Sequence, residues 1–165
     1  MRYARCKWVL PVLAAALANS GNASVNNSVP LAGDLRSAAD QAKAACVPLL
    51  LEFATDYCEY CVLLEEEVLK PMLLDRDYEQ RVLVRKLTID KAATLRDFDG
   101  HRVSAAQLAE RYRISLTPTL IFVDRRGHEL TERMVGVTTM EFYAGYLDQA
   151  LDSAGKKLRE QQPCR

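Results

Sequence analysis

The segment Leu49–Cys61 has the sequence LLLEFATDYCEYC, and it predicts a buried strand that leads into a helix. Its apolar run, Leu49 to Phe53, predicts a short strand buried on both faces of a sheet. The two cysteines that follow, Cys58 and Cys61, lead into apolar residues at helical spacing around the acidic run Glu65–Glu67. Cys58 therefore lies where a strand ends and a helix begins, and one helical turn places Cys61 beside it.

This position favours redox chemistry at the cysteine pair. The positive end of a helix dipole stabilises a thiolate at Cys58, and Cys61 is near enough to close a disulfide that can open again. A permanent structural disulfide, a zinc site and a buried thiol pair are the alternatives. So short a loop adds little chain-entropy stabilisation, which argues against a structural disulfide. The chain has no second Cys-x-x-Cys, and His101 and His128 are not spaced as a metal pair.

Length and composition predict one domain with a real core, because the chain has 165 residues and 49% of them are hydrophobic. The formal net charge is zero and no basic stripe occurs, so a nucleic-acid partner has no electrostatic support. No apolar segment reaches the ~18–20 residues that span a bilayer, so we expect no membrane span in the mature chain.

The N-terminus has the pattern of a secretory signal peptide. Basic residues within positions 2–7 precede the apolar segment Trp8–Ala18, and Gly21–Ala23 offers small residues for cleavage after Ala23. An uncleaved anchor is the alternative, but the apolar segment is short and contains Pro11. We therefore predict a cleaved signal over residues 1–23 and an exported, periplasmic protein, in a compartment that permits disulfides.

The remaining chain divides into a flexible linker (24–33), one domain (34–151) and a C-terminal tail (152–165). The pattern in the domain predicts helices and strands in the order α-β-α-β-α-β-β-α, at about residues 34–45, 49–53, 58–70, 81–90, 104–112, 119–123, 129–135 and 142–151. We expect Pro71 to stop or kink the second helix and Asp99-Gly100 and Asp124–Gly127 to form turns. The fold class is therefore α/β, a mixed central sheet flanked by helices on both faces.

The domain resembles the thioredoxin superfamily over roughly residues 34–151. The segments that carry the resemblance are LEFATDYCEYC (51–61), RKLTID (85–90), ISLTPTLIFVDRRG (114–127) and VGVTT (135–139). Within the superfamily the chain most resembles exported bacterial thioredoxin-like proteins, including the SoxW type. It departs from thioredoxin itself in having Tyr57 in place of tryptophan and Glu59-Tyr60 in place of Gly-Pro, so a redox potential and a partner cannot be carried over.

The resemblance implies a thioredoxin-like fold and roles for residues beyond the cysteines. Pro118 would follow a cis Thr117–Pro118 bond, pack over the cysteine pair and leave the preceding backbone to bind substrate as an added strand. Glu52 would be a buried acid that takes the proton of Cys61, with Lys86 as its partner. The alternative is a Glu52 that faces solvent from the strand.

Residues next to the pair would contact substrate, namely Tyr57, Glu59 and Tyr60. We also expect the negative charge of Glu59 to raise the pKa of Cys58, because a like charge opposes ionisation. The alternative is a Glu59 that points into water and is screened.

These observations predict an exported thiol–disulfide oxidoreductase. Cys58 would attack a protein disulfide and Cys61 would resolve the mixed disulfide, so that the protein reduces its substrates. No flavin or nicotinamide motif occurs, so the redox group would be the Cys58–Cys61 pair with no further cofactor. The resemblance implies a membrane protein as electron donor. A thiol oxidase or isomerase, and a non-catalytic binding or chaperone module, are the alternatives.

Other side chains carry smaller expectations. Cys46 and Cys164 would meet at the end of the sheet away from the pair and form a disulfide; the alternative is that both thiols stay reduced. Tyr143 and Tyr146 should belong to the core, and the run Glu65–Glu67 should be a solvated helix face.

Overall fold

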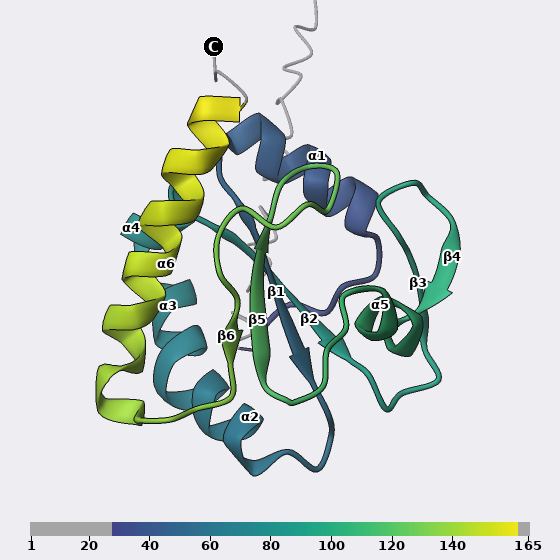
Figure 1. Ribbon diagram of the computed structural model, residues 1–165, viewed down its shortest axis with the longest axis horizontal. Helices are drawn as coiled ribbons and strands as arrows, with labels where there is room; N and C mark the ends of the chain where they lie inside the picture. Colours follow the sequence, from purple (N-terminus) through teal and green to yellow (C-terminus); the bar gives the residue numbers. More distant parts are fainter. Residues whose placement is uncertain (1–27, 162–165) are drawn as a thin grey trace, which may run out of the picture.

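A mixed four-stranded sheet forms the centre of the computed structural model, which describes residues 28–161 (Figure 1). The strands lie in the order β2-β1-β5-β6. Their bounds are β1 Leu49–Ala54, β2 Leu83–Thr88, β5 Thr119–Val123 and β6 Met134–Val135. β1 runs parallel to β2 and antiparallel to β5, which pairs antiparallel with β6. The predicted mixed sheet is confirmed.

Helices cover both faces of this sheet, as predicted (Figure 1). Their bounds are α1 Leu35–Ala45, α2 Glu59–Leu64, α3 Lys70–Leu74, α4 Arg76–Glu79, α5 Ala105–Arg111 and α6 Met140–Gln161, and a π-helical segment, η1 Glu65–Leu69, joins α2 to α3. Side chains of α2, η1, α3 and α6 pack in one apolar cluster, and those of α1 and α5 in another. Within residues 28–161 no helix combines the length and apolar character needed to cross a membrane.

β1 is buried along its whole length and separates the two clusters. Because successive side chains of a strand point to opposite faces, Leu51 and Phe53 join the cluster under α1 and α5. Leu50 joins the opposite cluster, and Glu52 shares its face. The buried acid of the sequence therefore lies on the side of the sheet that α2 and α6 cover.

A hairpin of two short strands lies within residues 94–104, where the sequence predicted a turn but no strands. β3 Thr94–Arg96 pairs antiparallel with β4 Arg102–Ser104. The predicted turn between them is confirmed, since Gly100 has a φ of 87°. Leu95 and Val103 are the buried apolar residues of these short strands, which is too little alternation for a clear strand pattern.

Pro71 does not stop the active-site helix, so of the two predicted effects of this proline, a stop or a kink, the stop is wrong. Helical structure continues to Leu74. The wide turn η1 ends two residues before the proline, and the Lys70 amide that closes it donates to the Glu65 carbonyl five residues back. Proline lacks an amide donor and crowds the carbonyl four residues before it, and a wide turn accommodates both defects.

The linker prediction is wrong for the part that the structure describes. Val29 is buried in the core, and two backbone hydrogen bonds of 2.8 Å attach the segment to β2, from Lys86 to Pro30 and from Ala32 to Lys86. Residues 28–33 thus cover the outer edge of β2. The signal peptide predicted over residues 1–23 lies outside the described residues and stays a prediction.

The tail prediction is also wrong for residues 152–161, because α6 continues through them. Ala154 and Leu158 are buried and extend the apolar stripe of Leu147 and Leu151. Cys46 is disulfide-bonded, but Cys164 lies outside the described residues, so their pairing stays a prediction.

One aromatic residue of α6 does not follow its prediction. Tyr143 is buried as expected, whereas Tyr146 is exposed, together with its neighbour Phe142. The buried face of α6 follows Tyr143, Leu147 and Leu151 at intervals of four, and Phe142 and Tyr146, also four apart, lie together on the exposed side.

Candidate redox site

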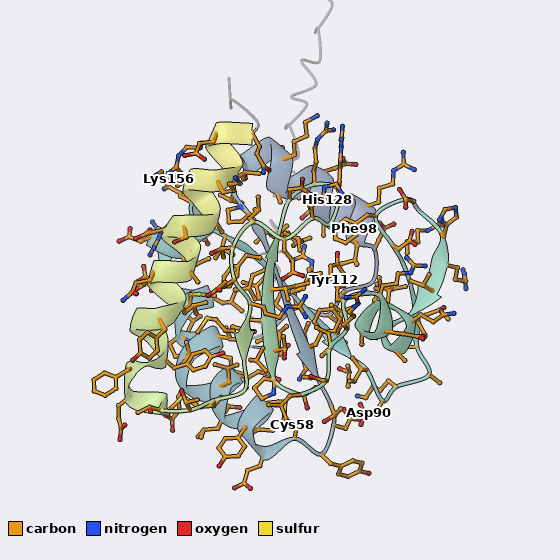
Figure 2. The ribbon with its side chains drawn as sticks, in the orientation of Figure 1. Cys58, Asp90, Phe98, Tyr112, His128 and Lys156 are labelled. Carbon is orange, nitrogen blue, oxygen red and sulfur yellow. A yellow bond between two sulfur atoms is a disulfide. The ribbon has the colours of Figure 1, made fainter. Side chains whose placement is uncertain are left out.

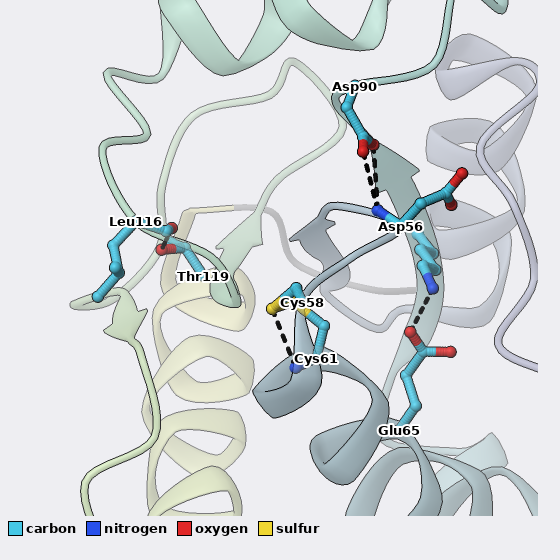
Figure 3. Close-up of a disulfide and its surroundings, with 8 residues drawn as sticks. Asp56, Cys58, Cys61, Glu65, Asp90, Leu116 and Thr119 are labelled. Atoms are coloured by element: carbon cyan, nitrogen blue, oxygen red, sulfur yellow. Dashed lines mark hydrogen bonds and ion pairs between the residues drawn. A yellow bond between two sulfur atoms is a disulfide. The ribbon is translucent and has the colours of Figure 1, made fainter.

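The two cysteines form a disulfide at the start of α2, beyond the end of β1 (Figure 3). Cys58 is the N-cap of α2, and its Sγ accepts a hydrogen bond of 3.1 Å from the Cys61 amide. The two sulfurs are 2.05 Å apart and the Cα atoms 5.2 Å apart. Cys58 is half-buried, whereas Cys61 is 1% exposed. Cys58 is therefore the sulfur that another molecule can reach.

The loop before Cys58 is attached to the end of β2 (Figure 3). The Asp56 amide donates to both carboxylate oxygens of Asp90, at 3.0 and 3.2 Å, and Lys91 Nζ lies 3.0 Å from Asp56 Oδ1. Asp90 follows β2, and parallel β1 and β2 bring their carboxyl ends to the same edge. The parallel pairing of the two strands was the signal that could have placed Asp90 here.

The predicted substrate-contacting residues beside the cysteines in the sequence face solvent. Tyr57 is 98% exposed and Tyr60 is 59% exposed, and Glu59 is exposed between them. Leu116, on the loop before β5, is also exposed and lies in the surroundings of the disulfide (Figure 3). Aromatic and apolar side chains at this rim give Cys58 a surface that a partner protein can contact.

The loop before β5 has the predicted backbone geometry. The Thr117–Pro118 peptide bond is cis, which confirms the prediction, and Pro118 is buried. The Pro118 carbonyl accepts a hydrogen bond of 2.8 Å from Gly136, and Thr119 Oγ1 donates to the Leu116 carbonyl at 2.7 Å. These bonds fix the loop that carries Leu116.

Glu52 points into the protein, so the alternative of an outward-facing side chain is wrong. It is 0% exposed, and neither carboxylate oxygen has a hydrogen-bond partner among the described residues. Burial raises the pKa of Glu52 to about 8, with a further rise from the negative charge of Glu65 and an opposing effect of Lys86. Glu52 can therefore hold or release a proton near neutral pH.

The predicted pairing of Lys86 with Glu52 is not a direct bond among the described residues, although the charge of Lys86 acts to lower the pKa of Glu52. The two residues are opposite each other in the parallel β1–β2 register, but the Lys86 ammonium forms its ion pair with Glu65. Glu65 is half-buried, so the prediction of a solvated face is also wrong for this residue. The missed signal was spacing, because Glu65 lies four residues after buried Cys61 and so faces the same way.

Tyr143 is another buried titratable group on this side of the sheet. It is buried, and its hydroxyl has no hydrogen-bond partner among the described residues. Burial raises the pKa of Tyr143, and the charge of Glu52 raises it further. The hydroxyl therefore stays protonated and faces the same apolar cluster as Glu52.

Comparison with known proteins gives the family. A model of the thioredoxin-like domain matches residues 35–151, which is more than half of the chain. No curated protein matches the sequence.

Solved structures of thioredoxins share the fold at low sequence identity. Oxidised mitochondrial thioredoxin 3 from Saccharomyces cerevisiae is 14% identical with a TM-score of 0.50, covering 75% of this chain and 93% of its own. Thioredoxin from Fasciola hepatica is 14% identical with a TM-score of 0.50, covering 74% and 96%. The similarity at this identity concerns the fold, and with the matching domain model it shows that the chain belongs to the thioredoxin-like family.

Proposed function

We propose that the protein is a thiol–disulfide oxidoreductase that reduces disulfide bonds of other proteins. The observation that carries the proposal is the pair itself, in which a half-buried Cys58 at a helix start is bonded to a buried Cys61. Exposed Tyr57, Tyr60 and Leu116 support a protein as substrate, because they offer aromatic and apolar surface on the segments next to the pair.

The reaction follows from the different accessibility of the two sulfurs. In the reduced protein the Cys58 thiolate attacks one sulfur of the substrate disulfide, and the other substrate sulfur leaves as a thiolate that takes up a proton. Cys61 then attacks Cys58, the Cys58–substrate bond breaks and the Cys58–Cys61 disulfide forms. The two cysteines lose two electrons, and the substrate disulfide gains them.

Glu52 supports the second step as a proton acceptor. Cys61 must lose its proton before it can attack, and Cys61 is too buried to give that proton directly to bulk water. A carboxylate with a pKa of about 8 is well matched to a thiol whose ordinary pKa is about 8.5. In the reverse direction the protonated Glu52 returns the proton to Cys61 as the disulfide opens.

Substrate would approach along the cis-proline loop. An extended segment could align with the backbone at Thr117, next to buried Pro118, as an added strand. Its disulfide would then lie over Cys58.

Export and the direction of electron flow are further parts of the proposal. Location in the periplasm rests on the predicted signal over residues 1–23, and supply of electrons by a membrane protein rests on the superfamily resemblance. The SoxW-type resemblance likewise rests on the sequence and stays a prediction.

Reduction of insulin by dithiothreitol, followed as precipitation, tests the activity. We expect the purified protein to accelerate it and both Cys58→Ser and Cys61→Ser to abolish the acceleration. Cys61→Ser should accumulate mixed disulfides with substrate, because Cys58 still attacks but nothing resolves the product. Cys58→Ser is the matched control and should trap none. Equal trapping by both variants, or no acceleration by the intact pair, would reject the enzyme in favour of a binding module.

A further inference from the structure

We propose that Glu65 is a positioning residue, which holds the Lys86 ammonium away from Glu52 and so keeps the Glu52 carboxyl able to exchange a proton with Cys61. The inference rests on the proposed function and extends it by naming the residue that controls the proton acceptor. It differs from the expectation for the sequence, in which Lys86 was the direct partner of Glu52.

The positions of the three side chains carry the inference. Glu52 and Lys86 are neighbours in register on parallel strands, where an ion pair between them would be the simplest arrangement. The Lys86 ammonium instead contacts Glu65 Oε1, and these two side chains are only 19% and 12% exposed. Both Glu52 oxygens are buried without a partner among the described residues. The one lysine that the register places beside Glu52 is thus occupied by a different carboxylate.

The groups around Glu52 make Glu65 the decisive charge. Lys86 faces it from β2, Glu65 from η1 and the Tyr143 hydroxyl from α6, while Leu120 lies opposite it on β5. The Cys58–Cys61 disulfide at the start of α2 is uncharged. Burial is the main cause of the raised pKa of Glu52, and the charge of Glu65, which also neutralises Lys86, raises that pKa further.

Removing the charge of Glu65 should therefore lower the pKa of Glu52 through two separate effects. The Glu65→Gln variant keeps the size of the side chain but loses its negative charge, so one repulsion disappears. Lys86 also loses its ionic partner and becomes available to Glu52. Both changes favour the Glu52 carboxylate and should lower its pKa by about one pH unit or more.

The matched control is Glu66→Gln. Glu66 lies on the same turn and forms an ion pair with Lys70, but its side chain is 57% exposed. The substitution removes the same charge and the same kind of contact at a position turned away from Glu52. A shift caused only by lost net charge or by a weakened turn would appear in both variants.

The test is a carbon-13 NMR titration of glutamate carboxyls in the oxidised full-length protein, with the Glu52 signal assigned by its loss in Glu52→Gln. We expect a midpoint near 8 in the wild type, a midpoint lower by about one unit or more in Glu65→Gln, and no change in Glu66→Gln. In the reduced protein, the acid limb of the rate of insulin reduction should move to lower pH in Glu65→Gln by the same amount.

An unchanged Glu52 midpoint in folded Glu65→Gln would overturn the inference, and so would an equal shift in Glu66→Gln. If Glu65→Gln does not fold, Lys86→Met replaces it: loss of the cation should raise the midpoint, and a constant midpoint overturns the inference again. The two claims can be distinguished. A protein that does not reduce insulin would contradict the proposed function, but it could still show the Glu52 titration that tests the inference.

Discussion

At the level of single residues, buried Glu52 makes folding depend on pH. Its pKa is raised to about 8 in the folded protein, from an ordinary value of 4.5. Between these pH values the folded carboxyl keeps its proton while the unfolded one has lost it. Stability from this group is therefore fully present below about pH 4.5 and declines as the pH rises through about 8.

The Glu52→Gln variant should consequently be more stable than the wild type in alkali. A neutral amide has no ionisation penalty, and linkage gives about 1.4 kcal/mol per pH unit over the interval from 4.5 to about 8, so we expect a gain of roughly 3–5 kcal/mol at pH 9 that vanishes near pH 4.5. Urea unfolding of the oxidised protein at several pH values measures it, with exposed Glu67→Gln as control. A gain that is the same at every pH would show that Glu52 does not titrate in this range.

Glu59 provides a second prediction, on the pKa of the attacking thiol. Its carboxylate is exposed next to Cys58, so Glu59→Gln should lower the thiol pKa, but only by a few tenths of a unit because water and salt screen the charge. The ultraviolet absorbance of the thiolate in reduced protein follows the titration. Glu66→Gln is the control and should leave the curve unchanged. The argument for Glu59 is lost if the wild type and Glu59→Gln titrate at the same pH.

The sequence was sufficient for the residues whose roles depend on local spacing. Cys58 and Cys61 follow from two residues between cysteines at a strand–helix junction, and cis Pro118 from the resemblance. Glu65 could not be assigned, because its ion pair joins residues 21 positions apart and depends on how η1 lies over β2. An acidic run is more often solvated, and only tertiary packing separates Glu65 from its neighbours.

At the level of helices and strands, local signals predicted starts better than ends. Asp34 caps α1 through the Ser37 amide, and Ser104 forms a capping box with Gln107 at the start of α5. These interactions lie within four residues and are visible in the sequence. The end of α6 was missed because charged residues surround its last apolar positions, Ala154 and Leu158, whose burial depends on the sheet beneath them.

Burial of the last turns of α6 predicts their contribution to stability. Leu158 is 5% exposed within the cluster that also holds Leu151, so Leu158→Ala should lower the free energy of unfolding by about 2–4 kcal/mol. Exposed Lys157→Ala is the matched control and should change it by less than about 0.5 kcal/mol. Urea unfolding measures both. Equal, small effects would mean that residues 152–161 do not pack against the domain.

At the level of the whole molecule, the titratable groups around Glu52 lie on one face of the sheet. The face under α2 and α6 holds Glu52, Glu65, Lys86 and Tyr143 beside its apolar cluster, and the opposite cluster, under α1 and α5, has Tyr112 packed against it. Parallel pairing of β1 and β2 brings the Asp56 loop and Asp90 to the same edge as Cys58. The overall α/β order could be predicted from the sequence, but the direction of these groups within the layers could not.

The central claim is that Cys58 and Cys61 exchange electrons with external thiols. Equilibrating the purified protein in glutathione buffers of stepped potential, alkylating it and mapping the pair by mass spectrometry tests this most directly. We predict a reversible two-electron transition, tenfold in the oxidised-to-reduced ratio per about 30 mV, with a midpoint closer to the ~−270 mV of thioredoxin than to the ~−120 mV of a strong oxidant. A pair that stays closed or unreactive in every buffer would contradict the proposed chemistry.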